Sequence, residues 1–93
     1  MKVRWTRQAL GDLQHVHEYI AEESIQAAGE MVSRIHQAVT LNLKEHPRMG
    51  KEGRVTGTRE LILAGTPYLL VYVLEGSEIQ IVTVLHSSRR WPE

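Results

Sequence analysis

The apolar residues of this 93-residue chain change their spacing once, and that change limits the folds open to the chain. Up to Leu43 they recur every three or four residues, which is the period of an amphipathic helix. From Arg59 onward they form three short runs rich in Leu, Ile and Val, separated by turn residues. A helical half followed by a strand half predicts an α+β fold.

Two apolar stripes with helical spacing make up the first half. The first has spacings of 4, 3 and 4 residues and consists of Ala9, Leu13, Val16 and Ile20, widened by Leu10 and Tyr19. The second has spacings of 3, 4, 3, 4 and 4 residues and consists of Ile25, Ala28, Val32, Ile35, Val39 and Leu43. Thr6 and Ser24 precede the two stripes as N-caps, and Pro47 ends the second. Because so few residues separate the stripes, they predict an antiparallel helical hairpin.

The second half predicts an antiparallel sheet. Its three β-prone runs cover residues 59–63, 68–74 and 78–86, and the short turns between them are typical of hairpins. One further β-prone stretch, residues 3–5, precedes the first helix. The predicted order is therefore β-α-α-β-β-β, with the helical hairpin packed on the apolar face of the sheet. No linker or repeat divides the chain, so residues 1–93 are expected to form a single domain.

Composition and motifs exclude several classes of function. The net charge is zero, which argues against nonspecific nucleic-acid binding by the whole surface. The chain has no Cys, no Gly-rich phosphate-binding loop and no nucleophile elbow. His15 and Glu18 lie one helical turn apart but lack a third ligand, so neither a metal nor a cofactor is expected. The longest apolar run is far shorter than a membrane span of about 20 residues, and we expect a soluble, cytoplasmic protein without membrane contacts.

Charged residues are unevenly distributed along the chain. Residues 10–33 contain five acidic residues and no Lys or Arg. Lys51 and Arg54 lie on a Gly-rich loop shortly before Arg59. These three cations are candidates to hold the phosphates of RNA or the carboxylates of a protein partner. The alternative is an ordinary solvated loop with surface cations.

His86 closes the last predicted strand. Strict alternation along that strand points Ile79, Ile81, Thr83 and Leu85 toward the helices, and so places His86 on the open face of the sheet. With Arg54 or Arg59 beside it, a histidine there has the minimal constellation of a ribonuclease. The simpler alternative is that His86 caps the end of the sheet through a hydrogen bond.

The C-terminal residues 87–93 are too few to fold alone. Trp91 can pack back on the sheet, which we favour, or offer a stacking surface beside Arg89 and Arg90.

Several segments taken together resemble the RelE/ParE superfamily of bacterial type II toxins. They are the element order, residues 57–61 (GTREL), residues 67–68 (PY), residues 71–72 (VY), and the ending formed by residues 81–86 (IVTVLH) and 89–92 (RRWP). Trp5-Thr6, Ala9, Asp12-Leu13 and residues 19–21 (YIA) also look like the ParE branch. The resemblance covers essentially the whole chain.

This resemblance implies a toxin that slows growth until a cognate antitoxin binds it in a hetero-oligomer. RelE-like members cut messenger RNA in the ribosomal A site without a metal, whereas ParE-like members poison DNA gyrase and are not nucleases. On the RelE pattern, Arg59 matches the strand arginine, Arg54 and Lys51 match the loop cations, and His86 matches the late general acid or base.

The chain departs from the RelE pattern in two respects. Few lysines accompany these residues, and the sequence ends before a C-terminal helix with a catalytic aromatic residue. The long hairpin and the RRWP ending look more like ParE, which implies a non-enzymatic gyrase poison whose Arg89, Arg90 and Trp91 contact the target. The alternative is a ribosome-dependent endoribonuclease with Arg54, Arg59 and His86 as catalytic residues. A plain binding module, with a role only in the antitoxin complex, is a third hypothesis.

Overall fold

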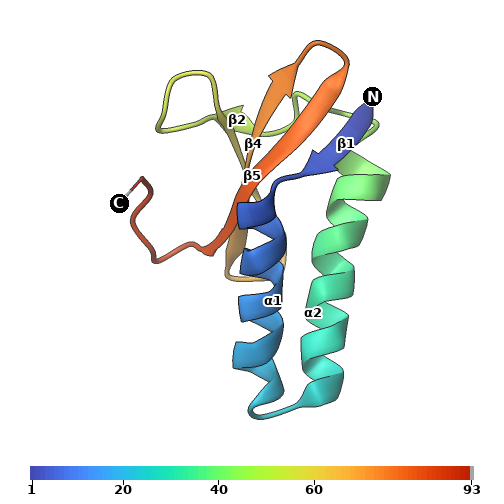
Figure 1. Ribbon diagram of the computed structural model, residues 1–93, viewed down its shortest axis with the longest axis vertical. Coiled ribbons are helices and arrows are strands. Elements are labelled where there is room, and N and C mark those ends of the chain that lie inside the picture. The colour runs from blue at the N-terminus through green and yellow to red at the C-terminus, as the bar shows by residue number, and fades with distance from the viewer. Residues whose placement is uncertain (93) are drawn as a thin grey trace.

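The structure is a computed structural model that describes residues 1–92, and it places a helical hairpin against one face of a five-stranded sheet (Figure 1). The helical elements are α1 (Arg7–Ala21), α2 (Ile25–Gln37) and its π-helical continuation η1 (Ala38–Leu43). The strands are β1 (Lys2–Trp5), β2 (Lys51–Glu52), β3 (Arg59–Ile62), β4 (Tyr68–Glu75) and β5 (Glu78–His86). The predicted α+β fold is confirmed, and the four predicted strands correspond to β1, β3, β4 and β5.

The strands lie in the order β1-β5-β4-β3-β2. β3, β4 and β5 form the predicted antiparallel meander, and β1 pairs in parallel with the first half of β5. The two-residue strand β2 was not predicted, and it pairs with Arg59 and Glu60 of β3. Two residues are too short a stretch to show an alternating pattern, so the sequence indicated only a loop there.

Both predicted N-caps are present. The Thr6 hydroxyl accepts a hydrogen bond from the backbone N–H of Ala9 at 3.2 Å, and the Ser24 hydroxyl accepts one from Ala27 at 3.1 Å. These bonds satisfy backbone donors that have no partner within the first helical turn. The second helical segment extends to Leu43, as its apolar spacing predicted, although its last six residues are π-helical.

The main core fills the space between the hairpin and the sheet. Its fully buried side chains come from both layers and include Ile35, Val39, Leu43, Leu70, Tyr72, Ile79 and Ile81. Ile25 was expected on the inward stripe but is 75% exposed, and Tyr19 and Leu10 are also exposed. Ile25 lies in the first turn of α2, and the tip of the hairpin extends past the sheet (Figure 1). No strand is therefore available there to cover an apolar side chain.

A β-bulge in the last strand corrects the predicted alternation. Tyr72 pairs with Ile81 and Val71 pairs with Thr83, so Val82 is an extra residue in β5. An extra residue shifts every later side chain to the other face. After the bulge Val84 faces the main core, while Leu85 packs on the open face of the sheet. The expectation that Leu85 points toward the helices is wrong for this reason.

The same bulge changes the position of His86. Its ring meets the ring of Tyr68, a member of the main core, edge-on with 5.7 Å between their centroids. His86 therefore lies on the helix side of the sheet at its end, not on the open face.

Candidate functional site

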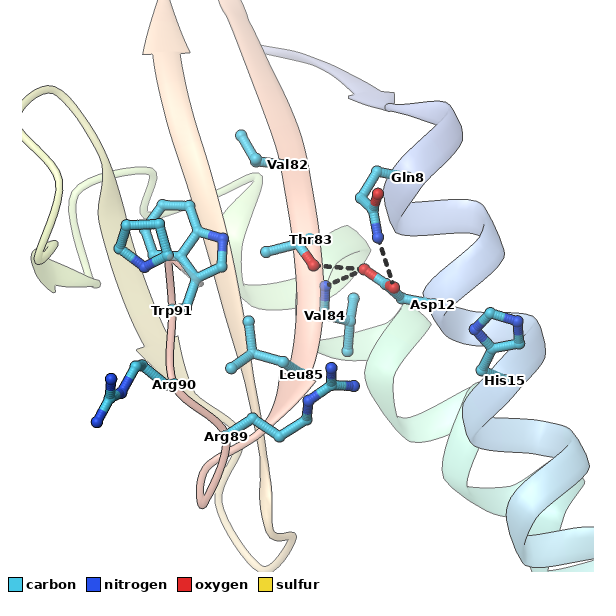
Figure 2. A pocket seen from close by; sticks show the side chains of 11 residues that line it. Gln8, Asp12, His15, Val82, Thr83, Val84, Leu85, Arg89, Arg90 and Trp91 are labelled. Carbon is cyan, nitrogen blue, oxygen red and sulfur yellow. Dashed lines mark hydrogen bonds between the residues drawn. The ribbon is translucent and has the colours of Figure 1, made fainter.

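The N-terminal half of α1 closes the edge of β5 where β1 ends. β1 pairs with β5 only as far as Ile81. The Thr6 hydroxyl donates to the carbonyl oxygens of Ile81 at 2.8 Å and Val82 at 3.0 Å. The Asp12 carboxylate accepts hydrogen bonds from the Val84 N–H at 3.1 Å and from the Thr83 hydroxyl (Figure 2). Side chains of the Thr6–Asp12 segment thus replace a neighbouring strand.

A cleft of about 510 Å³ lies beside this closed edge, between α1 and the C-terminal tail, which we define as residues 89–92. Trp91 of the tail packs on the open face of the sheet against Leu69, Val71 and Leu85, as favoured from the sequence. Figure 2 shows the Arg89 side chain directed toward β5 and that of Arg90 directed away from α1. The tail therefore brings the predicted target-binding residues Arg89, Arg90 and Trp91 together, with both arginines exposed.

Arg59 lies on the helix side of the sheet, opposite Tyr72. Its guanidinium donates to the carbonyl oxygen of Gly50 at 2.7 Å and to that of Arg48 at 3.3 Å. The Tyr72 hydroxyl accepts from the Gly50 N–H at 2.9 Å and donates to the Pro47 carbonyl at 2.7 Å. Burial raises the pKa of the Tyr72 hydroxyl and outweighs the opposing effects of Gly50 and Arg59. Arg59 and Tyr72 together fasten the 47–50 segment to the sheet.

Arg54 lies on the other side of the sheet, where it holds a buried carboxylate. Its guanidinium nitrogens are 3.1 to 3.2 Å from the carboxylate of Glu60, and its backbone N–H donates to the same group at 2.9 Å. Glu60 is 4% exposed and lies opposite Val71 on the open face. Burial alone would raise the pKa of Glu60, but the hydrogen bonds and charge of Arg54 outweigh it and hold that pKa below its usual value.

His86 lies at the far end of the sheet from these two arginines. Its partner on β4 is Tyr68, whereas that of Arg59 is Tyr72, and four residues along a strand span about 13 Å. The Nδ1 atom of His86 is 2.7 Å from the Ser88 hydroxyl oxygen and accepts the Ser88 N–H at 3.1 Å. The structure therefore does not bring Arg54, Arg59 and His86 together.

A second hollow of about 530 Å³ adjoins the cleft and was missed from the sequence. It lies between α1, α2, the start of β4 and the end of β5. Asp12, His15, Val84, Leu85 and Arg89 line both spaces, so they are continuous. Nothing in the sequence pattern indicated this surface, because the helical spacing places Tyr19 on the inward stripe, whereas its side chain is 72% exposed.

Within residues 1–92, no group of three or more His, Asp or Glu side chains is placed to hold a metal ion. None of the helices described is both long and apolar enough to span a bilayer.

Known proteins resemble this chain over nearly its full length. The family described as "ParE toxin of type II toxin-antitoxin system, parDE" matches residues 3–91. A putative toxin of Sinorhizobium fredii, Y4kP, is 39% identical over 92 residues, which cover 99% of this chain and 94% of that protein. Toxin RelE2 of Caulobacter vibrioides is 34% identical over 88 residues, covering 95% of this chain and 97% of that protein.

A solved structure shares the fold. A chain of the chromosomal ParDE TA system from P. aeruginosa superposes with a TM-score of 0.80 at 28% sequence identity, covering 92% of this chain and 95% of that chain. The match extends over the helical hairpin and the sheet alike. The family match and the relatives together show that this chain belongs to the ParE toxin family of type II toxin–antitoxin systems, within the RelE/ParE superfamily.

Proposed function

We propose that this toxin inhibits growth by poisoning DNA gyrase in the cytoplasm and that a cognate antitoxin neutralises it by binding it directly. The separation of the candidate nuclease residues is the observation that carries the choice of target. The family assignment and the likeness to a ParDE chain support the antitoxin as a partner.

A metal-independent nuclease needs a cation and a proton donor or acceptor within reach of one phosphate. Arg59 is engaged with the carbonyl oxygens of Arg48 and Gly50, and Arg54 is engaged with Glu60 on the opposite face. His86 lies about 13 Å along the sheet from Arg59, counted in strand residues. This arrangement favours structural roles for the two arginines.

The tail has the chemistry of a protein contact. Two exposed arginines directly precede a tryptophan that is itself anchored on the sheet, so the tail is held in place before it meets a partner. Arg and Trp are the side chains that most often dominate binding energy in protein interfaces. We infer that Arg89, Arg90 and Trp91 contact gyrase, with the acidic helical hairpin as a second contact.

The alternative function is a ribosome-dependent messenger RNA endoribonuclease. It is favoured by the 34% identity to Toxin RelE2 and by the exposure of His86. In this alternative His86 moves a proton, and the loss of one general acid or base typically lowers the rate by about 100-fold to 10,000-fold.

Toxicity of paired variants in cells separates the two functions. His86→Ala is expected to leave growth inhibition nearly intact, while Arg90→Glu is expected to reduce it strongly, because only the second alters the proposed contact. Arg7→Glu, which reverses an exposed cation on α1, is the matched control. Loss of toxicity in His86→Ala, with an unchanged circular dichroism spectrum, would instead favour the endoribonuclease.

A further inference from the structure

Ile62 is a large apolar side chain exposed on the open face of the sheet. The pairing of β3, β4 and β5 places Ile62, Leu69 and Leu85 in one row across that face. Trp91 packs on Leu69 and Leu85, which are buried, whereas Ile62 is 63% exposed. β2 pairs only with the first two residues of β3 and does not flank Ile62. Apolar surface therefore continues from the tail to the outer edge of β3.

The loop between β2 and β3, residues 53–58, is held against the same face. Arg54 of the loop pairs with Glu60, whose carboxylate is buried there. Burying a carboxylate without a partner is costly, so the pair fastens the loop to the sheet. At the base of the loop the Gly53 N–H donates to the Thr58 carbonyl at 2.8 Å. The loop, like the tail, is therefore in place before it meets a partner.

The loop and the tail project on the same side of the molecule, away from α2 (Figure 1). Val55 of the loop is exposed. We define the open-face patch as Val55, Ile62, Arg90 and Trp91. Because its parts are already fixed to the sheet, little conformational freedom is lost when a partner binds.

The charge around the open-face patch is positive. Arg90 is exposed, and Lys51 shares the open face with Glu60, its partner on β3. The Glu60 carboxylate is already paired with Arg54. Two copies that met through this patch would bring like charges together, because a two-fold contact joins a surface to itself. The open-face patch instead fits an acidic protein surface that offers an apolar pocket.

We propose that the open-face patch is a further part of the gyrase contact, and that it binds an acidic surface of gyrase with Ile62 in an apolar pocket. This inference rests on the proposed function, which assigns the tail to gyrase. The tail supplies Arg90 and Trp91 to the patch, so a gyrase surface seated on the tail also reaches Ile62. Ile62 is then an anchor residue, and Arg54 and Glu60 position the loop.

Gyrase-mediated DNA cleavage by purified toxin variants tests the anchor. Ile62→Glu is expected to raise the toxin concentration for half-maximal cleavage by at least about tenfold. Leu41→Glu is the matched control, because Leu41 is similarly exposed at 65% but lies on η1 in the helical layer, and it should change that concentration by less than about twofold. Ile62→Thr keeps a β-branched residue in the strand and should cause an intermediate loss. Equal effects of Ile62→Glu and Leu41→Glu would overturn the inference.

Binding of the co-expressed antitoxin identifies the partner of the patch. Ile62→Glu should change antitoxin affinity by less than about twofold, which also shows that the variant is folded. Loss of antitoxin binding with an unchanged effect on gyrase would assign the patch to the antitoxin and overturn the inference. If the wild type poisons gyrase and both Ile62 variants do so equally well, only this inference fails. If the wild type has no effect on gyrase, the proposed function fails as well.

Discussion

The Asp12 carboxylate accepts the backbone N–H of Val84 at 3.1 Å, and this bond joins the first helix to the last strand 72 residues later. The same carboxylate accepts the Thr83 hydroxyl and the Gln8 side-chain amide. Val84 and Thr83 follow directly after the bulge at Val82, where β5 has lost β1 as a neighbour. Asp12 therefore fixes the part of β5 from which the tail leaves.

Asp12→Ala should destabilise the fold by about 1 to 3 kcal/mol, because it leaves a backbone donor and a buried hydroxyl without their acceptor. Glu18→Ala, on the exposed surface of the same helix, should change stability by less than about 0.5 kcal/mol. Urea denaturation of the two variants measures the difference. Equal midpoints would show that the edge of β5 does not depend on Asp12.

Two isoleucines on α2 provide a matched test of the helix orientation. Ile35 is fully buried and Ile25 is 75% exposed. Ile35→Ala should cost about 2 to 5 kcal/mol of unfolding free energy, whereas Ile25→Ala should cost less than about 0.5 kcal/mol. Chemical denaturation monitored by circular dichroism measures both. A similar loss in the two variants would contradict the way α2 packs on the sheet.

Glu60 should make stability depend on pH in the acidic range. Its pKa is lower in the folded protein than the ordinary value of 4.5, so the unfolded chain binds the proton more readily. The contribution of Glu60 to the free energy of unfolding is therefore present above pH 4.5. It is lost as the pH falls through the lowered pKa that Glu60 has in the folded protein. Replacing Glu60 with Gln removes this dependence.

Urea midpoints at about pH 7 and about pH 3 measure that effect. The difference in urea midpoint between the wild type and Glu60→Gln should be large at the higher pH and smaller at the lower pH, because protonation of Glu60 removes the charge that Arg54 binds. Glu18→Gln, at an exposed position, is the control. A gap that widens in acid would contradict the role assigned to the Arg54–Glu60 pair.

Tyr72→Phe should loosen the 47–50 segment. The variant keeps the buried ring but removes the acceptor of the Gly50 N–H and the donor to the Pro47 carbonyl. A loss of about 1 to 3 kcal/mol is expected for an unsatisfied buried donor. Hydrogen exchange of the Gly50 amide should accelerate, while Tyr19→Phe, at a 72% exposed position, should leave it unchanged.

The helices and the element order were predictable because helical spacing and capping are local properties of the sequence. The Thr6 and Ser24 side chains cap their helices by bonding to residues three positions later. The apolar stripes that contain Val16 and Ile35 recur every three or four residues, which is about one helical turn. Ile25 follows the same period but lies beyond the end of the sheet. Its exposure depends on where the partner layer ends, and periodicity carries no information about that.

The site was less predictable because its geometry depends on pairing between distant segments. Val82 resembles its neighbours chemically, so nothing in an alternating pattern reveals that it is the extra residue of a bulge. That one residue moves His86 to the helix side of the sheet. Arg59 and Glu60 are neighbours on β3 and point to opposite faces, so Arg54, which is bonded to Glu60, lies across the sheet from Arg59.

Gyrase-mediated DNA cleavage in the presence of the purified toxin tests the proposed target most directly. The wild-type protein should cause gyrase to accumulate cleaved DNA, His86→Ala should do the same, and Arg90→Glu should do so much less. Translating ribosomes treated with the same preparation should keep their messenger RNA intact. No effect on gyrase, together with ribosome-dependent cleavage that His86→Ala abolishes, would contradict the proposal and establish the endoribonuclease in its place.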